Sequence, residues 1–168
     1  MRALFVGAGL AALASCDLWI GDPAASLPDA GAWVVLPMRA FLSRPGIDMV
    51  GMQLCTMAKC GYDAAIERFT ATGEQAVALE KQLSEPRQLA AVIGEKEPKS
   101  KIPPPKVAVE DFGSGNWSGV HVTMKGGAKS REVNGYVVSQ RNKAGATFIV
   151  VIAANGDIAK RLVAEATQ

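Results

Sequence analysis

Apolar and polar residues alternate along the C-terminal third of the chain, which is the pattern of half-buried β-strands. In residues 118–126, for example, Val120 and Val122 alternate with His121 and Thr123. Residues 146–154 are apolar throughout, which indicates a strand in the middle of a sheet. The pattern and its turn residues predict strands at residues 107–112, 118–126, 131–141 and 146–154, with a turn at 142–145.

The N-terminal half of the chain contains strand-like segments and also segments with the apolar spacing of helices. Residues 32–37 and 46–54 are strand-like runs on either side of a turn sequence containing Pro45 and Gly46. Helices are predicted at 64–71, 73–83 and 86–94, capped or opened by Asp63, Thr72 and Ser84, and at 156–166, capped by Asn155. The apolar face of the first two predicted helices consists of Ile66, Phe69, Ala76, Leu79 and Leu83.

This order of elements predicts the fold class α+β. Sequential strands joined by short turns indicate one antiparallel sheet of about five to six strands with helices packed on it. Residues 94–106 combine lysine, glutamate and proline, which could mark a linker between two domains or an exposed loop inside one. We expect an exposed loop inside a single domain, 32–168, because residues 107–168 alone, about 60 residues, would form only a thin core. The element order is similar to that of PsbP-like sandwiches, although no motif residue carries that resemblance.

The start of the chain has the features of an export signal. Residues 3–14 form an uncharged run after Arg2, too short to span a bilayer, which takes about 20 apolar residues, but long enough for a signal peptide. The next sequence, Leu13-Ala14-Ser15-Cys16, resembles the lipobox of bacterial lipoproteins. That resemblance implies cleavage of residues 1–15, acylation of Cys16 and a tether over 16–31.

The same resemblance implies a location. The acyl chains on Cys16 would insert in a lipid bilayer, which would place the domain at the bacterial cell membrane, facing the periplasm or the exterior. Asp17 resembles the signal that retains some lipoproteins in the inner membrane. Two alternatives remain open: Ala12-Leu13-Ala14 is also a cleavage site for ordinary secretion, and the run can be a buried N-terminal element.

If Cys16 is acylated, two cysteines are left, Cys55 and Cys60. In a chain predicted to be exported, a pair of cysteines favours a disulfide. In a straight helix their Cα atoms would lie about 8–9 Å apart, beyond the roughly 7 Å that a disulfide bridges. The bond therefore requires a turn, which Gly61 permits. The alternatives are two buried thiols or a redox-active pair, although the spacing is not C-x-x-C.

Composition gives little support to catalysis or to nucleic-acid binding. Eighteen basic and sixteen acidic residues leave a net charge of +2, without the concentrated basic surface typical of nucleic-acid binders. One histidine, His121, and three cysteines are too few for a typical zinc site, and the glycine-rich segments lack the phosphate-loop spacing, so no cofactor is expected.

One group of polar residues is a candidate binding face. It lies along the predicted antiparallel strands and is mildly basic, although such a row is usually the solvated side of a sheet. Its members are His121, Thr123, Lys125, Arg131 and Arg141. We therefore expect a membrane-anchored, non-enzymatic binding or assembly factor for another envelope component; the alternative is an exported enzyme, either a thiol oxidoreductase at Cys55 and Cys60 or a hydrolase at His121.

Overall fold

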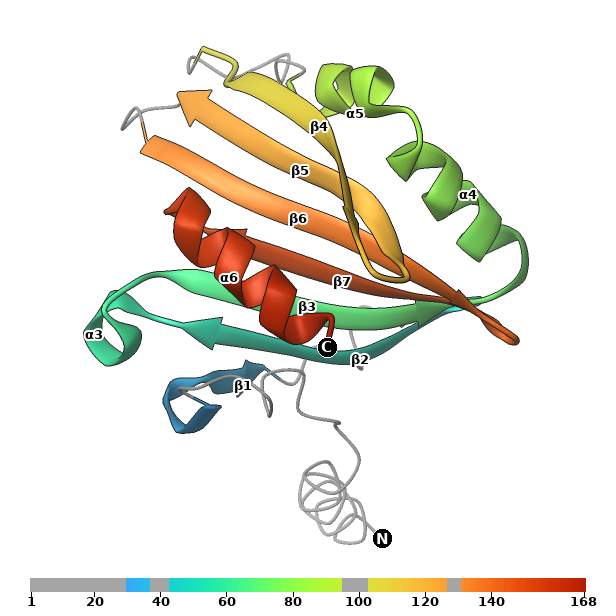
Figure 1. Cartoon of the computed structure of the whole chain (residues 1–168), viewed down its shortest axis with the longest axis horizontal. Helices are drawn as coiled ribbons and strands as arrows, with labels where there is room; N and C mark the ends of the chain where they lie inside the picture. Colours follow the sequence, from blue (N-terminus) through green and yellow to red (C-terminus); the bar gives the residue numbers. More distant parts are fainter. Residues whose placement is uncertain (1–29, 37–42, 95–102, 127–130) are drawn as a thin grey trace, which may run out of the picture.

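The computed structural model of the chain describes residues 30–36, 43–94, 103–126 and 131–168 (Figure 1). They form one antiparallel sheet in the order β1-β2-β3-β7-β6-β5-β4. Seven strands exceed the predicted five to six, while the α+β class is confirmed. The strands are β1 (Val34–Leu36), β2 (Ile47–Cys55), β3 (Ala64–Ala71), β4 (Lys106–Ser114), β5 (Trp117–Gly126), β6 (Arg131–Asn142) and β7 (Gly145–Ala153).

The additional strand is β3, and the prediction of a helix over residues 64–71 is wrong. β3 pairs with β2 on one side and with β7 on the other along its whole length. Ile66 and Phe69, three residues apart, therefore point to opposite faces of the sheet and join different parts of the core. Asp63 caps no helix there; its carboxylate accepts a hydrogen bond from Met57 N at 2.8 Å.

The helices cover both faces of the sheet (Figure 1). α6 (Gly156–Ala166) packs on the face that presents Ile66, Tyr136 and Val151, which we call the α6 face. The opposite face, the α4 face, presents Phe69 and Phe148. The other helical elements are η2 (Ala30–Ala32), α3 (Met57–Cys60), α4 (Gly73–Leu83) and α5 (Pro86–Ile93).

The α6 face holds the larger part of the core. Leu162 and Val163 of α6 are almost completely buried against the sheet. Burying a leucine side chain stabilises a fold by about 2 kcal/mol. Asn155 caps the helix, because its side-chain oxygen accepts hydrogen bonds from the backbone N–H groups of Asp157 and Ile158 at 2.8 and 3.3 Å.

The α4 face has a smaller core. The rings of Phe69 and Phe148, which are directly opposite each other on β3 and β7, stack with centroids 4.9 Å apart. Ala76 and Leu79 of α4 pack over this region. The predicted helix over 73–83 thus forms, and its apolar residues cover the sheet, whereas Ile66 and Phe69 belong to the sheet itself.

The strands of the C-terminal half follow the prediction closely. β4, β5, β6 and β7 are consecutive neighbours, and the turn after Asn142 joins the last two. β7 lies inside the sheet between β3 and β6, in agreement with its apolar composition. The predicted exposed loop ends earlier than expected because Lys106 already belongs to β4. Residues 95–102 lie outside the described part of the chain, as do the predicted signal peptide and most of the predicted tether.

Candidate ligand-binding site

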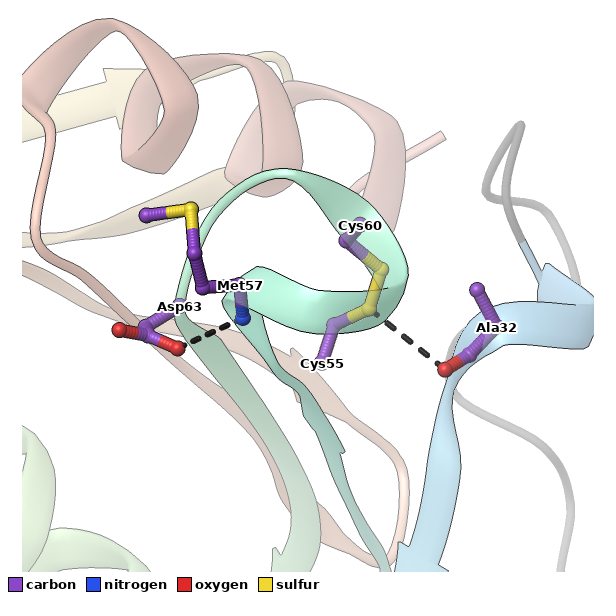
Figure 2. Close-up of a disulfide and its surroundings, with 5 residues drawn as sticks. All are labelled: Ala32, Cys55, Met57, Cys60 and Asp63. Atoms are coloured by element: carbon purple, nitrogen blue, oxygen red, sulfur yellow. Dashed lines mark hydrogen bonds between the residues drawn. A yellow bond between two sulfur atoms is a disulfide. The ribbon is translucent and has the colours of Figure 1, made fainter.

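The connection between β2 and β3 brings Cys55 and Cys60 together (Figure 2). Their Cα atoms are 6.0 Å apart, and the sulfur atoms have the arrangement of a disulfide. The bend between the two cysteines is made by Thr56, whose backbone is still extended, and by α3. Gly61, the residue after Cys60, ends α3 with a φ of 73°, the left-handed conformation that glycine adopts without strain. Cys55 is only 2% exposed, and its Sγ lies 3.6 Å from the carbonyl oxygen of Ala32. The pair is thus part of the core beside the N-terminal edge strand.

Three residues of the predicted binding face lie together on β5. His121, Thr123 and Lys125 all point to the α6 face, in line with the strand alternation. The Lys125 ammonium forms a 2.9 Å ion pair with Glu132 of β6. This hydrogen bond from Lys125, together with one from Asn134, lowers the pKa of Glu132. Lys125, the cation among these three residues, is therefore paired with a carboxylate of the neighbouring strand.

The two arginines of the predicted face are placed differently. Arg141 points to the α4 face, where its guanidinium pairs with the carboxylate of Glu80 in α4. Arg131 begins β6 opposite Gly126, and its side chain lies outside the described part. Cys16 lies outside it as well. The structure thus brings His121, Thr123 and Lys125 together and separates Arg141 from them.

The imidazole of His121 packs against an aromatic ring. The imidazole stacks on Tyr136 of β6 with centroids 4.5 Å apart and an interplanar angle of 14°. Its Nε2 is buried and has no hydrogen-bond partner among the described residues. Burial, and secondly the charge of Glu110, raise the pKa of Tyr136. The contacts of this histidine are therefore those of a packed side chain: no described hydroxyl or thiol is hydrogen-bonded to its buried nitrogen.

A polar pocket of about 710 Å³ opens on the α6 face, beside the C-terminal end of α6. Its residues come from elements far apart in the sequence. The floor consists of side chains from four adjacent strands, and the walls are the β4–β5 turn and the end of α6. Floor residues are Arg68, Thr147, Gln140 and Trp117; wall residues are Ser114, Gly115, Asn116, Ala164, Ala166, Thr167 and Gln168.

Arg68 is the charged side chain of this pocket. Its Nη2 donates a hydrogen bond to the carbonyl oxygen of Ala166 at 2.9 Å, which satisfies an acceptor at the end of α6. Its Nε is buried without a hydrogen-bond partner, and no carboxylate of the described residues forms an ion pair with it. Burial lowers the pKa of Arg68. The pocket thus contains a half-buried cation whose described partner is one backbone carbonyl.

The sequence does not identify Arg68 as a functional residue. In the predicted helix over 64–71 it would lie on the solvent side with Glu67. On the strand β3 it shares the α6 face with Ile66, which places it under the end of a helix almost one hundred residues later. The alternation of Ala64, Ile66 and Arg68 could have indicated a strand with these side chains on one face. This signal is weak because alanine fits either face of a sheet.

A second, smaller hollow of about 350 Å³ lies on the α4 face and is lined by Glu80, Asp111 and Ser139, among others. Glu80 is already paired with Arg141. The hydroxyl of Ser139 donates to the carbonyl oxygen of Ser118 at 3.4 Å. Glu80 and Ser139 of this hollow therefore already have partners, whereas the Nε of Arg68 has none among the described residues.

The chain has no match among known protein families and none among curated proteins. Over the described ranges, no helix combines the length and the apolar character needed to cross a bilayer. The same residues contain no group of three or more histidine, cysteine, aspartate or glutamate side chains that could hold a metal ion.

Proposed function

We propose that this chain is an exported, lipid-anchored binding protein that acts without catalysing a reaction, with the pocket at Arg68 as its ligand site. The observation that carries the binding role is a cation placed among neutral hydrogen-bonding side chains in an open pocket. The lipobox Leu13-Ala14-Ser15-Cys16 supports the anchor. Two or more acyl chains hold a protein on a membrane stably, because each buried CH₂ contributes about 0.8 kcal/mol.

The lining of the pocket is suited to recognition. Gln140 and Thr147 lie directly opposite each other on β6 and β7, so an amide and a hydroxyl face the ligand from a rigid sheet. Asn116 and Ser114 add further donors and acceptors from the β4–β5 turn. Nucleophilic catalysis pairs a hydroxyl or thiol with a base. The side chains that line this pocket include three hydroxyls but no histidine, cysteine or carboxylate.

A lipid-anchored protein with such a site fits the role of an envelope binding or assembly factor. The ligand can be a free small molecule or part of another envelope component, and the site would deliver or retain it at the membrane. We place the domain on the outer side of the cell membrane, with the inner membrane favoured by Asp17.

The anchor and the binding role are tested separately. Mass spectrometry of the protein from its own membranes should show a mature chain that begins at an acylated Cys16, and a Cys16→Ala variant should leave the membrane fraction. An unmodified Met1 on protein from the cytosol would refute the anchor. Substrate turnover that is lost in a His121→Ala variant would refute the non-enzymatic role.

A further inference from the structure

We propose that the pocket at Arg68 binds a small polar ligand through a single carboxylate, with acidic sugars as the ligand class. This inference rests on the proposed binding function and specifies the chemistry of that site. It is carried by three observations: the incomplete pairing of the guanidinium, the neutral character of the other lining side chains, and the aromatic ring in the floor.

The guanidinium of Arg68 has N–H groups that the described hydrogen bond does not use. An arginine side chain has five N–H groups, and the bond to the carbonyl of Ala166 uses one of them. The helix end supplies only a partial negative charge, about half an elementary charge. A half-buried cation without a full counter-ion has lost part of its hydration. A carboxylate restores the missing charge and fits the planar guanidinium through two parallel hydrogen bonds.

The neutral lining limits the ligand's charge. Apart from Arg68, the lining side chains are amides, hydroxyls, an indole and small apolar groups. One cation compensates one negative charge, which favours a monocarboxylate over a doubly charged phosphate. Gln140, Thr147 and Asn116 supply both donors and acceptors, which suit the hydroxyl groups of a sugar.

The pocket also has the size and the aromatic surface for a sugar ring. Trp117 begins β5 and lines the pocket beside the β4–β5 turn, where a flat indole can cover the apolar face of a ring. A volume of about 710 Å³ is well above what a free carboxylate needs. It lies within the range of about 300–1,000 Å³ that is typical of small-ligand pockets. The ligand that fits all three observations is thus an acidic sugar.

Calorimetric titration of the mature full-length protein in detergent tests this inference. The probes are D-glucuronate and D-glucose, which differ by a carboxylate in place of a CH₂OH group, together with inorganic phosphate. Glucuronate should bind saturably, glucose at least tenfold more weakly, and added KCl should weaken the glucuronate complex. Equal binding of glucuronate and glucose, tighter binding of phosphate, or no binding of glucuronate would each overturn the proposal.

Variants locate the site. Arg68→Met keeps the volume of the side chain and removes the charge, so it should weaken glucuronate binding by roughly tenfold or more, as expected for a hydrogen bond to a charged group. Because Arg68 also supports the end of α6, Gln140→Leu and Thr147→Val provide second tests and should each weaken binding several-fold. Lys81→Met, which removes an exposed cation of α4 on the opposite face of the sheet, is the matched control and should bind as the unmodified protein does.

Unchanged glucuronate affinity in Gln140→Leu and Thr147→Val would overturn the location. These outcomes are independent of the anchor test: an acylated Cys16 with no glucuronate binding refutes this inference alone. Glucuronate binding to a chain that keeps Met1 refutes the anchor and leaves the carboxylate site in place.

Discussion

Reduction of the Cys55–Cys60 bond should destabilise the fold without unfolding it. The two residues are five positions apart, so the bond closes a small loop in the unfolded chain. On the chain-entropy model, a loop of this size lowers the entropy of the unfolded state by about 7 cal/mol/K, which stabilises the fold by about 2 kcal/mol at 25 °C. With a urea m-value of about 2 kcal/mol/M, this corresponds to a shift of about 1 M in the midpoint.

Urea unfolding with and without reductant measures this shift. Trp33 is a suitable fluorescence probe, because it is buried in the same core cluster as Cys55. The control is a Cys55→Ala/Cys60→Ala variant, which loses the bridge and should unfold at one midpoint whether or not reductant is present. Thiol titration of the native protein should detect neither cysteine until the chain is unfolded or strongly reduced.

Two results would refute this reasoning. If two thiols titrate in the unfolded protein without reductant, and reductant leaves the urea midpoint unchanged, the pair is not bonded. If mild reductant opens the bond in the folded protein at once, burial of Cys55 does not protect it, and the redox-active alternative is favoured over a structural bridge.

Three further predictions concern the fold. Asn155→Ala removes the acceptor for two N–H groups of α6 and should cost about 1 kcal/mol in urea unfolding, whereas Asn155→Ser should retain most of the stability; equal midpoints for all three proteins would contradict the cap. Burial raises the pKa of Glu67 above its usual value of 4.5, so the folded state holds this proton more tightly than the unfolded state, and ionisation destabilises the fold as pH rises past that value. Glu67→Gln should therefore gain stability relative to the unmodified protein between pH 4 and 7, measured by unfolding at each pH, and a constant difference would contradict this. Gly119→Ala should destabilise by about 2 kcal/mol or more, because a Cβ would lie 2.7 Å from Val138 Cα and closer still to the carbonyl of Val137; the control, Gly113→Ala, meets no atom nearer than 3.8 Å and should unfold almost normally.

The elements with a clear local pattern could be predicted from the sequence. Strands β5 and β7 and the cap of α6 follow from alternation, apolar composition and Asn155. β3 could not, because its alanines and the central Glu67-Arg68 pair suit an exposed helix as well as a strand. The candidate binding face stays a prediction. Strand alternation places His121, Thr123 and Lys125 on one face, as the structure shows. Neither the pairing of Lys125 with Glu132 nor that of Arg141 with Glu80 is visible in a single strand.

By itself, the sequence determined the α+β class, the antiparallel order of the last four strands and the turn that Cys55 and Cys60 need, because each depends on residues close together in the chain. Only the tertiary structure decided that residues 64–71 are a strand, since the hydrogen bonds that hold them come partly from β7, about eighty residues later. The same long-range pairing places Arg68 beneath the end of α6 and opens the pocket there. A site assembled from distant segments leaves no local pattern, because the contacts that define it form only when strands far apart in the chain pair with each other.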